Sequence, residues 1–296
     1  CGFCASCTKS KDQSIKQDNT LKSDLIESYL EIAKDKNTPI GQRKENLEKA
    51  YVIYTTLVDN SLKVEKIHEI SKEYLKLKDL DIYKKLNEKS LKLSSVLVDS
   101  LNIARSFYNI GVYYRTKSEL ESAIKNFYSS DKVYASLNNV KYDPKDYLFD
   151  HGIVLLELAQ ILRKAKDYTE SESKTIDAIK KFELAKNYEF LPLSFNNLGI
   201  VSKHLERYDK AIEYYLKASE VAKGTEKEIL QTLVSYNNIG TVYKSQQKYD
   251  KAKEYFYKGL LFKEFLSNDP QRLARLIDNL AYVNFLSKDM KEIHDL

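Results

Sequence analysis

The sequence predicts an all-α fold, an α-solenoid of about seven helical hairpins, and three observations support this prediction. A short motif ending in a small residue recurs along the chain, with the small residue at positions 71, 111, 159, 199, 240 and 281. The successive steps are 40, 48, 40, 41 and 41 residues, which is the regularity of a repeat architecture. The chain is also rich in Lys, Glu and Leu, with only eight Gly and four Pro. Nothing alternates with a period of two for long enough to predict a sheet.

The first helix of each expected hairpin carries that small residue, and the second helix carries two further landmarks. Twelve residues after the small position stand Tyr83, Ala123, Ser171, Ala211, Ala252 and Ile293, and seven residues further stand Ser90, Ser130, Ala178, Ala218 and Gly259. Small side chains at such positions let two helices approach closely. Asp or Thr near the start of the second helices, at Asp81, Thr169, Asp209 and Asp250, is expected to cap them.

Two segments depart from the regular spacing. Residues 21–58 look like a degenerate first hairpin. The 48-residue step contains an insertion at 138–144 that ends in Pro144, and proline cannot continue a helix. We therefore expect a loop there.

Several of these residues resemble the tetratricopeptide repeat family, in its long-repeat type of about 40 residues. The resemblance rests on the aromatic-x-x-aliphatic-Gly starts at 195–199 and 236–240, on Tyr114 and Tyr243 three residues after Gly, and on the Tyr-Asp-Lys-Ala run at 208–211. It covers roughly residues 60–296 and implies a right-handed superhelical solenoid whose first helices line a concave, peptide-binding surface. The period exceeds the family's usual length of about 34 residues, and no repeat carries the closing Pro.

The N-terminal residues 1–20 hold all three cysteines of the chain, Cys1, Cys4 and Cys7. Small residues before Cys7 resemble the lipoprotein box of an exported bacterial protein, so we expect lipidation at Cys7 and a polar tether after it. The spacing also begins like an iron–sulfur run, but the chain has no fourth Cys. An incidental terminus without a role is the remaining alternative.

The rest of the chain, residues 21–296, is expected to form one solenoid whose last repeat is incomplete. The last copy aligns through Ile293 and stops three residues later, which predicts that the chain ends one turn into a second helix and that the gene continues past Leu296.

Composition and motifs argue against catalysis within these residues. The net charge of +5 is mild, so no nucleic-acid partner is expected. The four histidines are dispersed, and no metal-binding spacing, phosphate-binding glycine loop or nucleophile elbow is present. We expect no cofactor and no metal, and an enzyme only if a domain beyond this segment supplies the catalysis.

A stripe of recurring polar residues on the first helices is the candidate site. One row holds Asn109, Asn197, Asn238 and Asn279, a second row holds Arg115, Arg163, Lys203 and Lys244, and Tyr282 lies between the rows as a candidate anchor. An Asn side chain can pair with both the N–H and the C=O groups of an extended peptide, and the basic row favours an acidic segment. Alternatively, the amides join neighbouring repeats, and the basic row is a solvated helix edge.

The expected function is therefore binding of a protein or peptide, with two biological settings. The repeats resemble the sensory ectodomain of bacterial signalling proteins such as sensor histidine kinases, exported and facing the periplasm or envelope. A lipid-anchored scaffold in envelope or outer-membrane protein assembly, held to the membrane through Cys7, is the alternative. A cytoplasmic location and a homodimer also stay open.

Overall fold

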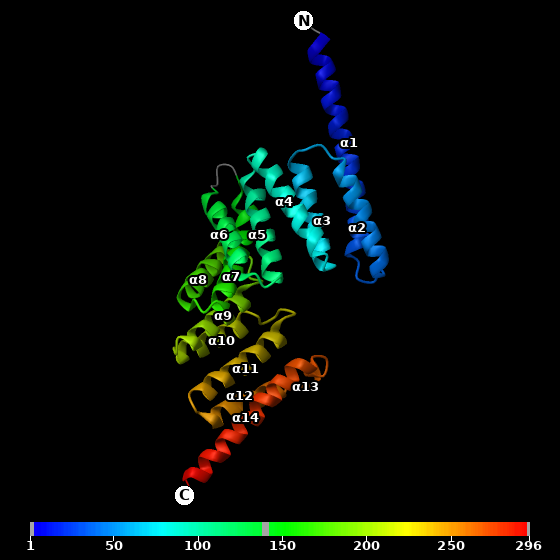
Figure 1. Cartoon of the computed structure of the whole chain (residues 1–296). Coiled ribbons are helices and arrows are strands. Elements are labelled where there is room, and N and C mark those ends of the chain that lie inside the picture. Colours follow the sequence, from blue (N-terminus) through cyan, green and yellow to red (C-terminus); the bar gives the residue numbers. More distant parts are fainter. Residues whose placement is uncertain (1–2, 138–141, 295–296) are drawn as a thin grey trace. The chain divides into compact units, whose positions relative to one another are not determined.

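The computed structural model describes the backbone of residues 3–137 and 142–294, and the side chains of residues 17–137, 142–145, 147–262 and 264–287. Every regular element within those residues is a helix, which confirms the all-α prediction (Figure 1). The chain divides into two compact units, Cys1–Asp143 and Pro144–Leu296, which we call unit 1 and unit 2. The single solenoid over residues 21–296 stays a prediction.

Unit 1 consists of three helical hairpins. The helices are α1 (Phe3–Lys34), α2 (Ile40–Thr55), α3 (Ser61–Lys76), α4 (Leu80–Val96), α5 (Ser100–Thr116) and α6 (Leu120–Ser136). Helices pack within each hairpin, and α4 packs on α5 to join the second hairpin to the third. The predicted degenerate hairpin at 21–58 is present as α1 and α2.

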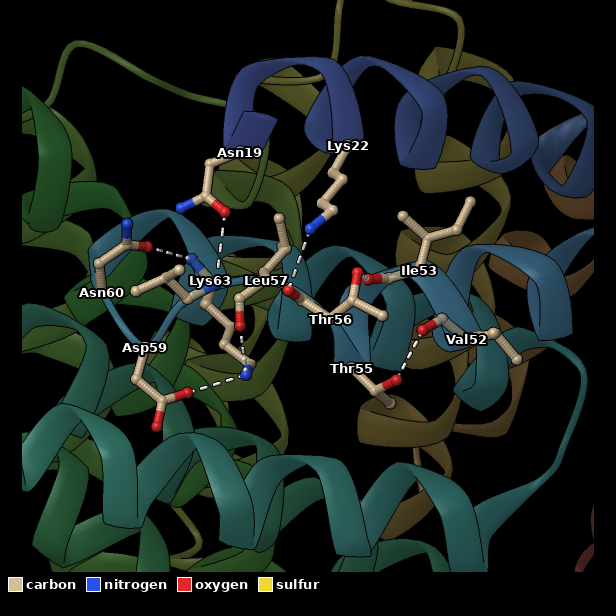
Figure 2. A network of polar contacts seen from close by, with 11 residues as sticks. Asn19, Lys22, Val52, Ile53, Thr55, Thr56, Leu57, Asp59, Asn60 and Lys63 are labelled. Atoms are coloured by element: carbon tan, nitrogen blue, oxygen red, sulfur yellow. Dashed lines mark hydrogen bonds and ion pairs between the residues drawn. The ribbon is translucent and has the colours of Figure 1, made fainter. Parts of the chain in front are cut away.

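Polar contacts hold the first hairpin to the start of α3, as Figure 2 shows. The Lys63 Nζ atom donates to the Leu57 carbonyl at 2.7 Å and pairs with Asp59 at 2.8 Å. Asn60 caps α3 by accepting from the Lys63 backbone N–H at 3.1 Å, while Asn19 of α1 accepts from the Val58 N–H at 3.3 Å. These bonds satisfy backbone groups of the α2–α3 connection that would otherwise be left without partners.

Unit 2 repeats the same hairpin and ends in a long helix. Its helices are α7 (Pro144–Lys164), α8 (Tyr168–Leu184), α9 (Leu191–His204), α10 (Tyr208–Glu220), α11 (Glu228–Ser245), α12 (Tyr249–Leu260), α13 (Lys263–Leu266) and α14 (Pro270–His294). Pro144, expected to end a loop, is the first residue of α7, where its missing N–H costs no helical hydrogen bond. Residues 138–141 of that predicted loop lie outside the described residues.

The turn inside five of the hairpins places a residue other than glycine in the left-handed region. It falls seven positions after the small residue in five repeats, at Lys78, Ser118, Lys166, Glu206 and Gln247, with φ between 58° and 66°. The next residue donates its N–H back across the turn, as Asp79 does to the Tyr74 carbonyl at 2.9 Å and Lys248 to the Tyr243 carbonyl at 3.0 Å. This is the Schellman ending of a helix, and it fixes where the second helix begins.

Three of the recurring small residues allow an aromatic ring to press on the first helix. Gly111 lies against Phe127, Gly199 against Tyr215 and Gly240 against Phe256, each ring coming from the second helix of the same hairpin. A Cβ atom at Gly199 would lie only 2.5 Å from the Tyr215 ring. The two repeats that have Ser71 or Ala159 instead carry Asn87 or Thr175 at the aromatic position. The residues predicted to lie where the second helix touches the first are buried, namely Tyr83, Ser90, Ala123, Ser130, Ser171, Ala178, Ala211, Ala218, Ala252 and Gly259.

Two local predictions are wrong. Asp81, Thr169, Asp209 and Asp250 lie inside the second helices, and the N-caps stand two residues earlier, at Asp79, Asp167, Arg207 and Lys248. The predicted turn before Ile293 is absent, because α14 continues unbroken to His294. Extending a helix costs less than nucleating a new one.

The N-terminal segment is helical from Phe3, as the first part of α1. The side chain of Cys7 lies outside the described side chains, so its lipidation and the polar tether stay predictions. Among the described residues, no helix is both long and apolar enough to span a lipid bilayer.

Candidate functional site

The predicted Asn row joins each first helix to the preceding one. Asn238 Nδ2 donates to Asn196 Oδ1 at 2.8 Å, and Asn279 Nδ2 donates to Asn237 Oδ1 at 3.0 Å. In each pair the donor stands two residues before its own small residue, and the acceptor stands three before the small residue of the preceding repeat. These hydrogen bonds between side-chain amides, which we call the lacing, therefore connect α9 to α11 and α11 to α14.

Unit 1 contains the same diagonal contact. Asn109 Nδ2 lies 3.1 Å from His68 Nδ1, and His68 occupies the position of Asn196 and Asn237 in its repeat. The same amide nitrogen donates to Asn87 Oδ1 of α4 at 2.7 Å. Asn109 and Arg115 thus belong to unit 1, and the other predicted binding residues belong to unit 2.

Asn197 makes a different set of contacts because its diagonal neighbour is Leu156, which has no polar side-chain group. It is 3% exposed and donates to Thr175 Oγ1 of α8 at 2.8 Å. Its Oδ1 atom accepts from Arg163 Nε of α7 at 2.7 Å. The side chain is thus held on both sides by protein groups.

The basic positions of unit 2 reach forward to the next first helix. Arg163 of α7 donates to Asn197 of α9, Lys203 of α9 to Thr241 of α11 at 3.2 Å, and Lys244 of α11 to Asn279 of α14 at 3.0 Å. We call Arg163, Lys203 and Lys244 the basic row. Each member is half-buried and bonded to a neutral side chain, and none forms an ion pair with any residue whose side chain the structure describes.

Burial disfavours the charge on every member of the basic row. It lowers the pKa of the Lys203 ammonium, to which the Lys244 charge contributes further, and it lowers the pKa values of Lys244 and Arg163. Burial also lowers the pKa of the neighbouring His204, with contributions from Lys203 and Arg163. The face therefore carries positive charge that no carboxylate among the described side chains pairs with.

Tyr282 lies at the end of this row and is 54% exposed. The Lys244 Nζ atom stands 5.3 Å from the ring centroid, which is within the range of a cation–π interaction. Arg115, the remaining residue of the predicted basic row, belongs to unit 1, where its charge acts on the Tyr83 phenol. Burial raises the pKa of Tyr83, and the charge of Arg115 opposes that rise. We use "first-helix face" for the unit 2 set of Arg163, Asn197, Lys203, Asn238, Lys244, Asn279 and Tyr282.

A small, partly open pocket adjoins this face between α11, α13 and α14. Its lining is apolar at Leu233, Val234, Leu266 and Leu276, and polar at Asn237, Asn238, Arg272 and Arg275. Arg272 pairs with Asp269 at 2.9 Å. No cluster of three or more potential metal ligands occurs in the described part of the chain. The chemistry available at this face is hydrogen bonding and charge pairing.

Sequence reasoning missed the acceptors of the lacing, which are His68, Asn196 and Asn237. Their signal was present, since each stands directly before the position of the predicted row. It also missed Tyr168, whose ring stacks on His204 with centroids 4.7 Å apart.

Comparisons with known proteins agree with this architecture. A family model of the tetratricopeptide repeat matches residues 190–264, while no curated protein sequence matches the chain. One similar structure is a signal transduction ATPase with numerous domains and a tetratricopeptide repeat sensor from Pyrococcus horikoshii. The two sequences are 20% identical and the TM-score is 0.67. The match covers 92% of this chain and 41% of the other chain.

Two further structures are similar along most of their lengths. BtubC (BKLC) from P. vanneervenii is 14% identical with a TM-score of 0.59, covering 86% of this chain and 92% of the other. The apo form of RapI is 13% identical with a TM-score of 0.57, covering 85% and 92%. At these identities the likeness concerns the fold. The family model and the repeated hairpins agree with this likeness, which shows an all-α fold of repeated helical hairpins similar to that of tetratricopeptide repeat proteins.

Proposed function

We propose that this chain is a protein-binding module whose first-helix face in unit 2 holds an acidic, extended segment of a partner. Tetratricopeptide repeats typically bind proteins or peptides, which gives the general function. The observation that carries the finer proposal is the basic row, because Arg163, Lys203 and Lys244 are half-buried and their hydrogen bonds to described side chains go to neutral acceptors. A carboxylate from a partner would supply the missing negative charge.

The strength of such binding comes from charge-assisted hydrogen bonds. A bond between Lys and a carboxylate is roughly twice as strong as one between neutral groups. Lys203 and Lys244 can exchange the Thr241 hydroxyl and the Asn279 amide oxygen for partner oxygens by rotating flexible side chains. Asn279 would then have its Oδ1 atom free to accept from a backbone N–H of the partner. Lys203, Lys244 and Asn279 therefore join neighbouring helices in the free protein and bind the partner in the complex.

Binding can be tested with a fluorescent peptide of about twelve residues, half of them Glu, and its Gln-containing counterpart. We expect the Glu peptide to bind, and the Lys203→Gln/Lys244→Gln variant to bind about tenfold more weakly. The matched control is Lys180→Gln/Lys258→Gln, which removes two exposed charges from second helices. If both double variants bind the Glu peptide equally weakly, the weaker binding comes from the change in net charge alone, and this result would contradict the proposal.

We further propose that the segment is the sensory region of a bacterial signalling protein, such as a sensor histidine kinase with tetratricopeptide repeats. The likeness in fold to a tetratricopeptide repeat sensor supports this setting. In this proposal the segment itself performs no catalysis, and a separate output domain responds to partner binding. A fusion of an output domain to the repeats would test this proposal. The acidic peptide should then change the activity of the output domain. The same fusion with Lys203→Gln/Lys244→Gln should not respond.

The alternative is a lipid-anchored scaffold, and the Ala5-Ser6-Cys7 sequence favours it. It requires that Cys7 be lipidated in the exported protein. Cys7→Ser in the full-length protein should then abolish palmitate labelling and partitioning into detergent, with Cys4→Ser as the matched control. Unchanged partitioning of the Cys7→Ser protein would remove this alternative.

A further inference from the structure

The pocket between α11, α13 and α14, which we call the α11–α14 pocket, has buried apolar walls and a polar mouth. Leu233, Leu266 and Leu276 are at most 2% exposed, and Val234 is partly exposed beside them. The polar lining residues are all more exposed than the three leucines. The buried end of the pocket therefore favours an apolar group, because a polar group placed against these leucines would lose its hydrogen bonds to water.

The volume of the pocket limits the size of that group. The pocket has a volume of about 50 Å³. A cavity that holds a benzene ring measures about 150 Å³, and one water molecule needs about 10–15 Å³. The pocket thus has room for about three or four heavy atoms. This is the size of the branched end of a Val, Leu or Ile side chain, and it excludes an aromatic ring.

The α11–α14 pocket is continuous with the first-helix face, because Asn238 belongs to both. Thr241, which accepts from Lys203, donates its hydroxyl to the Asn238 backbone carbonyl at 2.8 Å. The pocket therefore begins one turn of α11 away from a contact of the basic row. One turn rises about 5.4 Å, so a residue close in sequence to the one that pairs with Lys203 can reach the pocket.

The charge at the mouth of the pocket suits the same acidic segment. Arg272 pairs with Asp269 at 2.9 Å. Arg275, one turn further along α14, is exposed and forms no salt bridge with any residue whose side chain the structure describes. Its guanidinium can take a carboxylate in a bidentate pair. Apolar walls next to this arginine fit an aliphatic residue that has an acidic neighbour.

We propose that the acidic partner segment carries one Val, Leu or Ile residue, and that this side chain inserts into the α11–α14 pocket. The inference rests on the proposed function and specifies its ligand further. The basic row supplies attraction for acidic residues in general, whereas the pocket selects among acidic segments by the size and polarity of one side chain.

Three labelled peptides test the inference by fluorescence anisotropy. Each has about twelve residues, half of them Glu, and they differ only in a central Leu, Asn or Trp. We expect the Leu peptide to bind about tenfold more tightly than the Asn peptide, because its side chain leaves water. The Trp peptide should not share this gain, since its ring is too large for the pocket.

A substitution that fills the pocket locates the preference. In Val234→Phe the larger side chain occupies the pocket, so the Leu and Asn peptides should bind equally well. The matched control is Leu193→Phe, because Leu193 occupies the same position of α9, six residues before the small residue, is 40% exposed and does not line the pocket. This control should keep the preference for Leu. Melting curves establish that both variants are folded, and Val234→Met replaces Val234→Phe if the latter is not.

The outcomes separate this inference from the proposal beneath it. Equal affinities of the wild type for the three peptides, all weakened by Lys203→Gln/Lys244→Gln, would overturn the pocket and leave the acidic-segment function standing. A preference for Leu that survives Val234→Phe would place the side chain elsewhere and overturn the inference, as would tighter binding of the Trp peptide than of the Leu peptide. Absence of binding by all three peptides would overturn both proposals.

Discussion

Each of Gly111, Gly199 and Gly240 shares its hairpin with an aromatic ring that occupies the space of a side chain. The Tyr215 ring would meet a Cβ at Gly199 at 2.5 Å, and Tyr215 is itself buried. We expect Gly199→Ala to lower the free energy of unfolding by about 1–3 kcal/mol, because the ring must shift within a packed core. Chemical denaturation measures the change.

Gly41→Ala is the matched control, since Gly41 lies in α2 and a Cβ atom at this position would have no neighbouring atom within 4 Å. We expect that variant to be neutral or slightly stabilised, because alanine favours a helix more than glycine does. A double variant of Gly199→Ala with Tyr215→Thr mimics the pairing of Ala159 with Thr175, and should lose less than the two single losses added together. Additive losses would mean that the ring and the glycine are not coupled.

His68 predicts a pH dependence of unit 1. Burial lowers its pKa to about 4, assisted by the charge of Arg105, and the opposing contributions of Asn87, Asp99 and Asn102 are smaller. Its ring nitrogens contact Ser90 and Asn109. The folded-state pKa is below the unfolded value of about 6.5, so the unfolded chain binds the proton first. The contribution of neutral His68 is thus complete above about pH 6.5 and is lost as the pH falls toward 4.

The expected loss between about pH 7 and pH 5 is about 2 kcal/mol. Urea denaturation of the wild type and of His68→Gln at both pH values measures it, because carboxylates and the other histidines contribute equally to the two proteins. The variant should lose less stability on acidification. An equal loss in both proteins would show that His68 does not carry the effect.

At the scale of the element, the second helices differ in how they begin. Asp167 caps α8 by accepting from the Glu170 backbone N–H at 3.1 Å, with φ of −82° and ψ of 79°. Lys248 starts α12 with nearly the same backbone, φ of −85° and ψ of 68°, but makes no side-chain cap. We expect Lys248→Asp to raise the free energy of unfolding by about 1 kcal/mol, because its carboxylate would accept from the Lys251 N–H. Thermal melting measures the gain.

Lys248→Ala controls for the loss of the positive charge near the start of α12. It removes the ammonium without supplying an acceptor, so it should gain less than Lys248→Asp. If the two variants melt at the same temperature, the gain comes from the charge rather than from the cap.

At the scale of the whole molecule, the hairpins could be predicted from sequence because their landmarks are local. The second helices begin three residues before the landmarks Tyr83, Ala123, Ser171, Ala211 and Ala252, at Leu80, Leu120, Tyr168, Tyr208 and Tyr249. The caps were misplaced because Asp79 and Asp81 are both suitable by type, and only the Schellman turn decides between them. The lacing of Asn238 to Asn196 was not predictable in detail, because it depends on the offset between neighbouring repeats rather than on spacing within one.

The division into two units predicts how the molecule unfolds. In repeat proteins each repeat is stabilised mainly by its neighbours, so a local defect propagates through contacting repeats. We expect Gly240→Ala, in α11, to speed amide hydrogen exchange through α9–α14 of unit 2 and to leave α3–α5 of unit 1 unchanged. Gly111→Ala, in α5, should do the reverse. Hydrogen exchange with mass spectrometry measures both, with Gly41→Ala as the undisturbed reference. Faster exchange in both units from either substitution would show a single cooperative solenoid over residues 21–296.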